Sequence, residues 1–307
     1  MRHFLDLSAL TKADVRAILN EAHQRKRARA GWPKAAPDSD APLHGHALAM
    51  IFQKNSTRTR VSFDIGIRQL GGVPIIMNAS ETQLGRGETV EDTARVLSRM
   101  VDAVMIRANN HQDVLDFAAA SAVPVINGLT DLSHPCQILA DIMTIEEWRG
   151  PIEGKTIAWL GDGNNVCMSF VHAAEKLPFT LRIATPPNYA PRRQEIEAAQ
   201  KAGAQVRVTN DPHAAISGAD VVITDTWVSM GDTDKDARMK AFPPYAVDEV
   251  IMQRAAPDAI FLHCLPAHRG EEVMDAVMDA PNSAVWDEAE NRIHAQKAVM
   301  LWCLGKI

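Results

Sequence analysis

Short apolar runs alternate with longer segments of helical periodicity along most of this 307-residue chain. Neighbouring parallel strands need a crossover between them, and the crossover is usually a helix. The alternation therefore predicts parallel sheets covered by helices. The expected strands are 47–52, 73–77, 103–106, 123–126, 156–160, 181–184, 205–208, 221–224 and 260–262. The expected helices are 58–70, 89–100, 134–149, 167–177, 192–202, 244–255, 271–278 and 287–304.

The strand and helix patterns form two successive arrays, and the chain is long enough for two domains. The predicted fold class is α/β, with two doubly wound parallel-sheet domains joined by long helices. We expect a first domain over 1–133, completed by 288–307, and a second over 150–287. A helix over 134–149, ended by Gly150-Pro151, would join them.

Composition excludes several classes of protein. No apolar run approaches the roughly 20 residues that cross a bilayer, and the first residues lack the apolar core of a signal peptide. The four cysteines show no CxxC spacing, so neither a disulfide framework nor a zinc site is expected. A net charge of -6 argues against nucleic-acid binding. We expect a cytoplasmic protein that binds neither membranes nor nucleic acids.

Polar clusters follow the predicted strands at their carboxyl ends, which is where open α/β sheets bind ligands. With two such sheets, we expect an active site in the cleft between the domains. The clusters are Ser56–Arg60, Arg107, Ser133–Gln137, Gly161–Asn165, Asp225 and His263–Pro266.

The Ser56–Arg60 cluster, STRTR, lies between a strand and a helix. Unpaired N–H groups, hydroxyls and guanidinium groups at a helix start favour a tetrahedral dianion. The P-loop pattern is absent, which disfavours nucleoside triphosphates. The alternative is helix capping with surface arginines, but arginine at a helix N-terminus opposes the dipole.

His134 and Gln137 lie on one face of a helix whose start is fixed by Pro135. Together they could polarise a carbonyl oxygen. An isolated histidine would more often be a capping or core residue, and Arg107 alone could be an exposed strand end.

Three further clusters leave alternatives open. GDGNNV resembles a dinucleotide fingerprint but has Val166 in place of the third glycine and lacks the ribose-binding acid, so nicotinamide binding is disfavoured. The segment after Asp225 is either a mobile lid or an ordinary acidic loop. Cys264 could be an inert packing residue, and its neighbours His263 and His268 lack a third metal ligand at suitable spacing.

Taken together, the motifs resemble the carbamoyltransferase family, and within it the members that act on ornithine. The resemblance extends over essentially the whole chain and rests on FQKNSTRTR, QLGRGE, MIR, HPCQ, GDGNN, DTWVSMG and HCLPAHRGEEV. Gln53 and Met168 depart from forms common in the family, at positions without an implied role. The implied carbamoyl phosphate-binding residues are Ser56, Thr57, Arg58, Thr59, Gln83, Arg107, His134, Gln137, Cys264, Leu265 and Arg292. The implied ornithine-binding residues are Asn165, Asp225, Ser229 and Met230.

The resemblance implies transfer of a carbamoyl group from carbamoyl phosphate to the δ-amine of L-ornithine, giving L-citrulline and phosphate, in arginine biosynthesis. The implied catalytic residues are Arg107, His134, Gln137, Asp225 and Cys264. No metal or cofactor is expected, because carbamoyl phosphate is already activated. The family implies a homotrimer or a multiple of trimers, with the loop near Gln83 reaching a neighbouring site. The rivals are a carbamoyltransferase for aspartate, putrescine or an acylated ornithine, and a catalytically silent paralogue.

Overall fold

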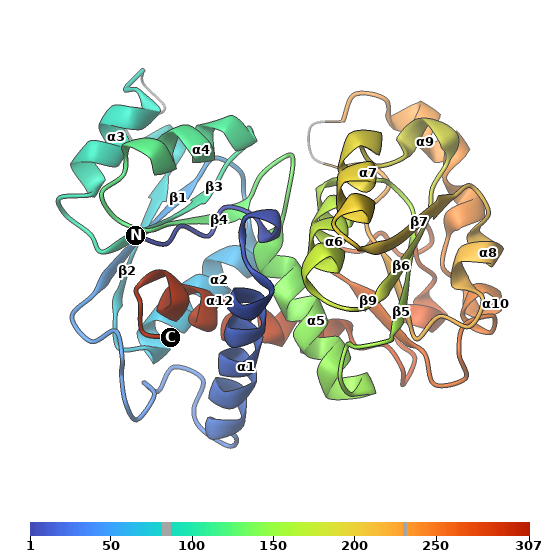
Figure 1. The fold of residues 1–307 in the computed structure, drawn as a ribbon, viewed down its shortest axis with the longest axis horizontal. Helices are drawn as coiled ribbons and strands as arrows, with labels where there is room; N and C mark the ends of the chain where they lie inside the picture. Colours follow the sequence, from blue (N-terminus) through green and yellow to red (C-terminus); the bar gives the residue numbers. More distant parts are fainter. Residues whose placement is uncertain (82–86, 230–231) are drawn as a thin grey trace. The chain divides into compact units, whose positions relative to one another are not determined.

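The computed structural model describes residues 1–81, 87–229 and 232–307 (Figure 1). The chain divides into two compact units, the first made of Met1–Ala140 with Glu290–Ile307 and the second of Asp141–Ala289. Each unit contains one all-parallel sheet covered by helices, which confirms the predicted fold class. The predicted cleft between the two sheets stays a prediction.

The sheet of the first unit has four strands in the order β2-β1-β3-β4. Their bounds are Ala47–Phe52 for β1, Val73–Asn78 for β2, Ala103–Arg107 for β3 and Val125–Leu129 for β4. β1 is central, with Leu48 opposite both Pro74 of β2 and Ala103 of β3. The carboxyl ends of β1 and β3 therefore meet at Phe52 and Arg107.

Helices cover both faces of this sheet (Figure 1). On one face, Ile51 and Ile106 pack against α3 and α4. The opposite face carries α2, and a Cβ added to Gly66 of that helix would lie 3.3 Å from Met300 of α12. Close packing of α2 on α12 thus explains a glycine inside a helix. The helices and helical turns of this unit are η1 (Leu7–Ala9), α1 (Lys12–Ala28), α2 (Thr57–Gln69), η2 (Ala79–Glu81), α3 (Val90–Leu97) and α4 (His111–Ala120).

Two long helices belong to both units. α5 (Pro135–Arg149) begins in the first unit and ends in the second, and α12 (Val285–Cys303) runs from the second into the first. Within the first unit, α12 is hydrogen-bonded to α1, because Trp302 Nε1 donates to Asp14 Oδ1 at 3.1 Å.

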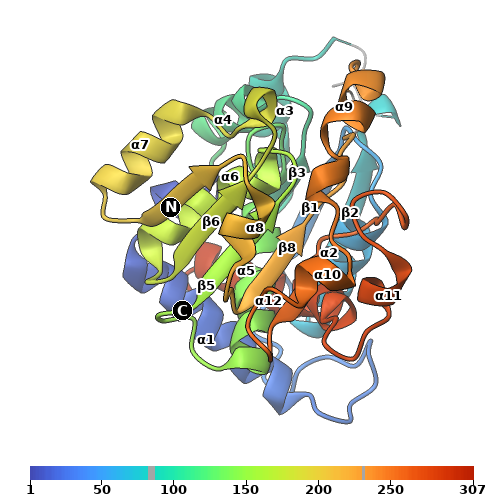
Figure 2. The same ribbon diagram turned by 90° about the vertical axis from the view of Figure 1, so that its right-hand side faces the viewer.

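The sheet of the second unit has five strands in the order β7-β6-β5-β8-β9. Their bounds are Thr156–Leu160 for β5, Thr180–Ala184 for β6, Gln205–Thr209 for β7, Val221–Thr224 for β8 and Ile260–His263 for β9. Ala158, Val222 and Phe261 share a core with α8 and α10 on one face (Figure 2). Trp159 points to the other face, where its ring lies 6.1 Å from that of Phe170 in α6. The helices and turns are α6 (Asn165–Lys176), η4 (Pro187–Tyr189), α7 (Arg193–Lys201), α8 (Pro212–Ile216), α9 (Lys235–Ala241), η5 (Pro243–Tyr245), α10 (Glu249–Met252) and α11 (Asp275–Met278).

Two predicted helices were wrong over at least half of their length. The helix expected over 244–255 is broken, because Val247 pairs with Val273 in a parallel bridge. The same bridge shortens the helix expected over 271–278 to α11. The pattern also missed α1, α4, α8 and α9, and α9 occupies part of the predicted lid. Among the described residues, no helix combines the length and apolarity needed to cross a bilayer.

Candidate functional site

The STRTR cluster begins helix α2 directly after β1. Ser56 is the N-cap in an extended conformation, and its Oγ accepts the N–H of Thr59 at 3.2 Å. Thr57 is exposed, Arg58 is half-buried and Thr59 is buried. The remaining N–H groups of the first turn and the positive end of the helix dipole make this a favourable site for an anion.

Four buried side chains from four elements meet beside this helix start. Thr59 Oγ1 of α2 accepts from Arg107 Nη1 at 3.4 Å and from Arg292 Nη2 at 3.2 Å. Arg292 Nη1 donates to Gln137 Oε1 at 2.5 Å. Arg107 is the last residue of β3, Gln137 lies in α5 and Arg292 lies in α12. The buried guanidinium groups of Arg107 and Arg292 therefore both face the Thr59 hydroxyl. Together with Arg58 they favour a ligand with negative charge.

His134 lies just before α5 and is 5% exposed. Burial holds its pKa well below the usual 6.5, and the positive charges of Arg292, Arg107 and Arg58 lower the pKa further. The imidazole is therefore neutral at neutral pH and can donate a single hydrogen bond. A neutral donor in a positively charged setting is suited to polarising a carbonyl oxygen.

Arg60, the second arginine of the cluster, is directed elsewhere. Its Nη2 donates to Asn78 Oδ1 of β2 at 2.6 Å, and its guanidinium lies 4.8 Å from the centroid of the Phe52 ring. Arg60 thus braces the ends of β1 and β2. Gln83, predicted to bind carbamoyl phosphate, and Met230, predicted to bind ornithine, lie outside the described residues.

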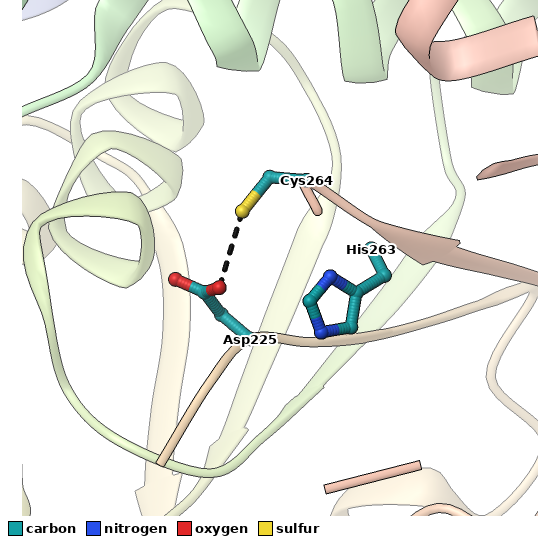
Figure 3. A group of neighbouring side chains, drawn as sticks. All are labelled: Asp225, His263 and Cys264. Carbon is teal, nitrogen blue, oxygen red and sulfur yellow. Dashed lines mark hydrogen bonds between the residues drawn. The ribbon is translucent and has the colours of Figure 1, made fainter. Parts of the chain in front are cut away.

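A second cluster of candidate residues lies in the second unit, around Asp225 at the end of β8 (Figure 3). Asp225 is 8% exposed. Its Oδ1 accepts from Cys264 Sγ at 3.2 Å and from the N–H of Thr226 at 2.8 Å. Its Oδ2 accepts from Asn164 Nδ2 at 2.8 Å. These contacts fix a carboxylate suited to holding an ammonium group.

Cys264 is a hydrogen-bond donor in this cluster. Burial raises the pKa of its thiol well above the ordinary value, and the charges of Asp225 and Glu288 raise the pKa further. The sulfur is therefore a thiol at neutral pH, which suits binding and positioning better than nucleophilic attack.

His263 stands beside Asp225 and Cys264, and ligand atoms of the three lie within 4.8 Å of one another (Figure 3). Both ring nitrogens of His263 already have protein partners, Glu272 for Nε2 and the N–H of Leu265 for Nδ1. The geometry therefore favours a structural role for this ring over metal binding.

Two features of this cluster were missed from the sequence. The first is Asn164, which caps α6 through its Oδ1 while its Nδ2 holds Asp225; Asn165, the predicted ligand, is the first residue of that helix. The adjacent asparagines were the only signal available, and they did not distinguish the two roles.

The second missed feature is Arg238 of α9, which braces the segment that contains Ser229. Its Nη1 donates to Asp162 Oδ2 at 2.8 Å and to the Trp227 carbonyl at 2.9 Å. Burial raises the pKa of Asp162 to about 6, although Arg238 opposes the rise. The N–H of Ser229 donates to Asp232 Oδ2 at 2.7 Å. The hypothesis of a mobile lid did not predict these hydrogen bonds within the segment.

Comparisons with known proteins identify the family of both halves of the chain. Residues 2–147 match the carbamoyl-P binding domain of aspartate/ornithine carbamoyltransferase, and residues 153–303 match its Asp/Orn binding domain. An ornithine carbamoyltransferase of Caulobacter vibrioides is 64% identical over 306 residues, which cover 100% of this chain and 98% of that protein. One from Rhizorhabdus wittichii is 60% identical, covering 100% of this chain and 99% of that protein.

Solved structures of ornithine carbamoyltransferases are also similar to this chain. The ornithine carbamoyltransferase from Pyrococcus furiosus superimposes with a TM-score of 0.93 at 48% identity, covering 100% of this chain and 98% of that chain. The anabolic ornithine carbamoyltransferase from Campylobacter jejuni has a TM-score of 0.93 at 40% identity, covering 100% of both chains.

Proposed function

The chain belongs to the aspartate/ornithine carbamoyltransferase family, and from this premise we propose that it carbamoylates L-ornithine. The carbamoyl group of carbamoyl phosphate moves to the δ-amine, and L-citrulline and phosphate are released. The observation that carries the proposal is the meeting of Arg107, Arg292 and Gln137 around Thr59, beside the neutral imidazole of His134.

On the carbamoyl phosphate side, the N-terminus of α2 and Arg58 bind the phosphate group. Ser56, Thr57 and Thr59 supply hydroxyl and backbone contacts, as the family resemblance implies. Arg107, His134 and Gln137 bind the carbonyl oxygen, where negative charge grows as the amine attacks. Arginine charge also stabilises the departing phosphate.

On the ornithine side, Asp225 binds the δ-ammonium group and Cys264 donates to the same carboxylate. An alkylamine has a pKa near 10.4, so the δ-amine must lose a proton before it attacks, and the phosphate group can take up that proton. The amino-acid end of ornithine is bound by Asn165, Ser229 and Met230, the last of which lies outside the described residues. Leu265 and Arg292 are proposed to complete the carbamoyl phosphate contacts.

The test is an acceptor assay that measures phosphate release and the carbamoylated product in parallel. Ornithine, aspartate, putrescine and N-acetylornithine are supplied separately with carbamoyl phosphate. We expect citrulline from ornithine to dominate. Another dominant acceptor would contradict the substrate, and no turnover from folded protein would favour the silent-paralogue rival.

A matched pair of variants tests the phosphate site. Arg58→Ala should weaken carbamoyl phosphate binding about 100-fold, because a charge-assisted contact to a dianion is lost. Arg68→Ala removes an arginine from the other end of the same helix, where it pairs with Asp64 on the surface, and should leave binding unchanged. Equal carbamoyl phosphate affinities of the two variants would contradict this assignment.

We further propose that the protein is a cytoplasmic homotrimer, or a multiple of trimers, that serves arginine biosynthesis. Support for the pathway comes from the similar Campylobacter jejuni protein, which is described as anabolic. Support for self-association comes from β2, an edge strand on which Val73, Ile75 and Ile76 are exposed.

A further inference from the structure

The segment His263–His268 carries both Cys264 and Leu265, and its backbone is held by buried side chains. The N–H of His263 donates to Glu288 Oε2 at 2.9 Å, and the N–H of His268 donates to Glu272 Oε1 at 2.5 Å. Between them, the N–H of Leu265 donates to Nδ1 of His263 at 2.9 Å. Since the sheet ends at His263, these acceptors replace the missing strand partners.

The hydrogen bonds of His263 select one tautomer of its imidazole. A backbone N–H can only donate, so Nδ1 must accept the bond from Leu265. Nε2 must then carry the hydrogen, which it donates to Glu272 Oε1 at 3.2 Å. His263 and Glu272 are both 0% exposed, so water cannot replace either partner. The opposite tautomer would place a hydrogen on Nδ1, facing the N–H of Leu265.

Leu265 shows why this bond matters. Its φ is +58°, in the left-handed region that costs a residue with a Cβ about 1 kcal/mol or more. Such a conformation persists only where the surroundings impose it. The bond from Leu265 N–H to His263 supplies that constraint, and it fixes the peptide between Cys264 and Leu265. That peptide contains the Cys264 carbonyl, so fixing it restricts the backbone that carries the Cys264 thiol.

We propose that His263 and Glu272 are positioning residues for the transfer reaction. Glu272 holds His263 in the Nε2–H tautomer, and Nδ1 then holds the Leu265 turn that aims Cys264 at Asp225. This inference rests on the proposed function, because it assigns the pair to the ornithine-binding half of the reaction. Neither residue is among the proposed substrate contacts, so we assign both a role through the turn.

Paired substitutions test the role of each partner. His263→Asn places a carboxamide oxygen near the position of Nδ1 and keeps an acceptor for Leu265, whereas His263→Leu removes it. We expect His263→Leu to raise the KM for ornithine about 10-fold or more and His263→Asn to recover most of that loss. Carbamoyl phosphate affinity, measured by calorimetry, should stay within about 2-fold of wild type in both.

The same logic applies to Glu272. Glu272→Gln keeps a side-chain oxygen that accepts from His263 and His268, and Glu272→Leu does not. The control is Glu271→Gln, which changes the neighbouring acid, whose side chain is 39% exposed, and should have no effect. If the conservative and apolar variants were impaired equally at each position, the pair would be packing residues only and the proposal would be overturned.

A spectroscopic measurement makes the test independent of activity. In protein labelled with ¹⁵N-histidine, the ring nitrogens of His263 are assigned by comparison with His263→Asn. We expect the Nε2–H tautomer in wild type and in Glu272→Gln, and a mixture or the Nδ1–H form in Glu272→Leu. An Nδ1–H tautomer in wild type would overturn the proposal.

The two measurements separate the possible failures. Absence of ornithine carbamoylation in wild type, with the Nε2–H tautomer present, would reject the proposed function and leave the constraint on the turn intact. Should Glu272→Leu fail to fold, the wild-type tautomer and the comparison of the two His263 variants decide the matter.

Discussion

His294 of α12 is expected to make the free energy of unfolding depend on pH. It is 5% exposed, and burial lowers its pKa to about 3, with Lys297, Lys26 and Arg29 adding to the effect. An unfolded chain binds a proton at this histidine near pH 6.5, and the folded chain does not. Stability is therefore lost as pH falls below about 6.5 towards 3.

The variant His294→Gln removes this titration. Between pH 7.5 and 5, the free energy of unfolding should fall by about 1 to 2 kcal/mol more in wild type than in the variant. Urea denaturation at the two pH values measures the difference. Parallel losses in the two proteins would show that His294 is protonated in the folded state.

At the residue scale, chemical type identified some candidate positions and long-range contacts supplied the rest. Arg107 and His134 stood out because charged or titratable groups followed apolar strands. Arg292 was implied only by the family resemblance, since its partner Gln137 is 155 positions away in the chain. The brace from Arg238 to Asp162 spans 76 positions and has no local signal at all.

Elements of secondary structure explain how the phosphate-side residues are presented, and helix caps allow a matched test. Ser56 caps α2, and Thr89 caps α3 by accepting the N–H of Asp92 at 3.1 Å. Ser56→Ala and Thr89→Ala should each cost about 1 kcal/mol of stability. Only Ser56→Ala should weaken carbamoyl phosphate binding, because only α2 begins at the proposed phosphate site. Calorimetric titration would contradict this if both variants bound equally well.

Strands were predicted better than helices for a physical reason. A buried parallel strand is apolar on both faces, so Ala47–Phe52 and Val221–Thr224 are visible as continuous apolar runs. A helix that contacts the sheet along one stripe leaves a weaker pattern, as in α8, which packs on β5 and β6. Val247 shows the other failure, because its bridge to Val273 overrides the helical periodicity around it.

At the scale of whole structural units, a buried ionic cluster joins distant parts of the first unit. Lys297 of α12 donates to Asp38 Oδ1 and to Gln69 Oε1, both at 2.9 Å. Asp38 also accepts from Arg29 Nη1 at 2.7 Å and from Arg25 Nη1 at 2.9 Å. Asp38 thus contacts three cations, of which Arg25 also pairs with Glu21 and Asp40. Burial lowers the pKa of Lys297 to about 8.

Because Asp38 is the acid that Arg29 and Lys297 share, the members of the cluster should differ in their effect on stability. Asp38→Asn leaves the buried cations Arg29 and Lys297 without this counter-ion and should cost about 3 to 5 kcal/mol. Lys297→Met leaves Asp38 with both arginines and removes a costly buried ammonium, so its loss should be smaller. Thermal and urea unfolding of the two variants measures the order, and a greater loss in Lys297→Met would contradict it.

Self-association is the prediction at the largest scale. Within the part of the chain that the structure describes, β2 pairs only with β1, and Val73, Ile75 and Ile76 of this edge strand are 56%, 43% and 38% exposed. Because side chains alternate along a strand, Ile75 and Ile76 point to opposite faces, so the apolar surface wraps around the edge. An apolar edge strand left open to water invites aggregation, which a specific interface would prevent.

Ile75→Lys places a charge on this edge and should dissociate the proposed trimer. Val250→Lys is the control, since Val250 is 57% exposed but lies on α10 in the second unit. Sedimentation velocity at assay concentration should show trimers for wild type and the control, and smaller species for Ile75→Lys.

If the loop near Gln83 completes a neighbouring site, dissociation should also lower kcat, because each separated chain would lack a neighbour's contribution. A wild-type monomer with full activity would refute both the assembly and the shared site.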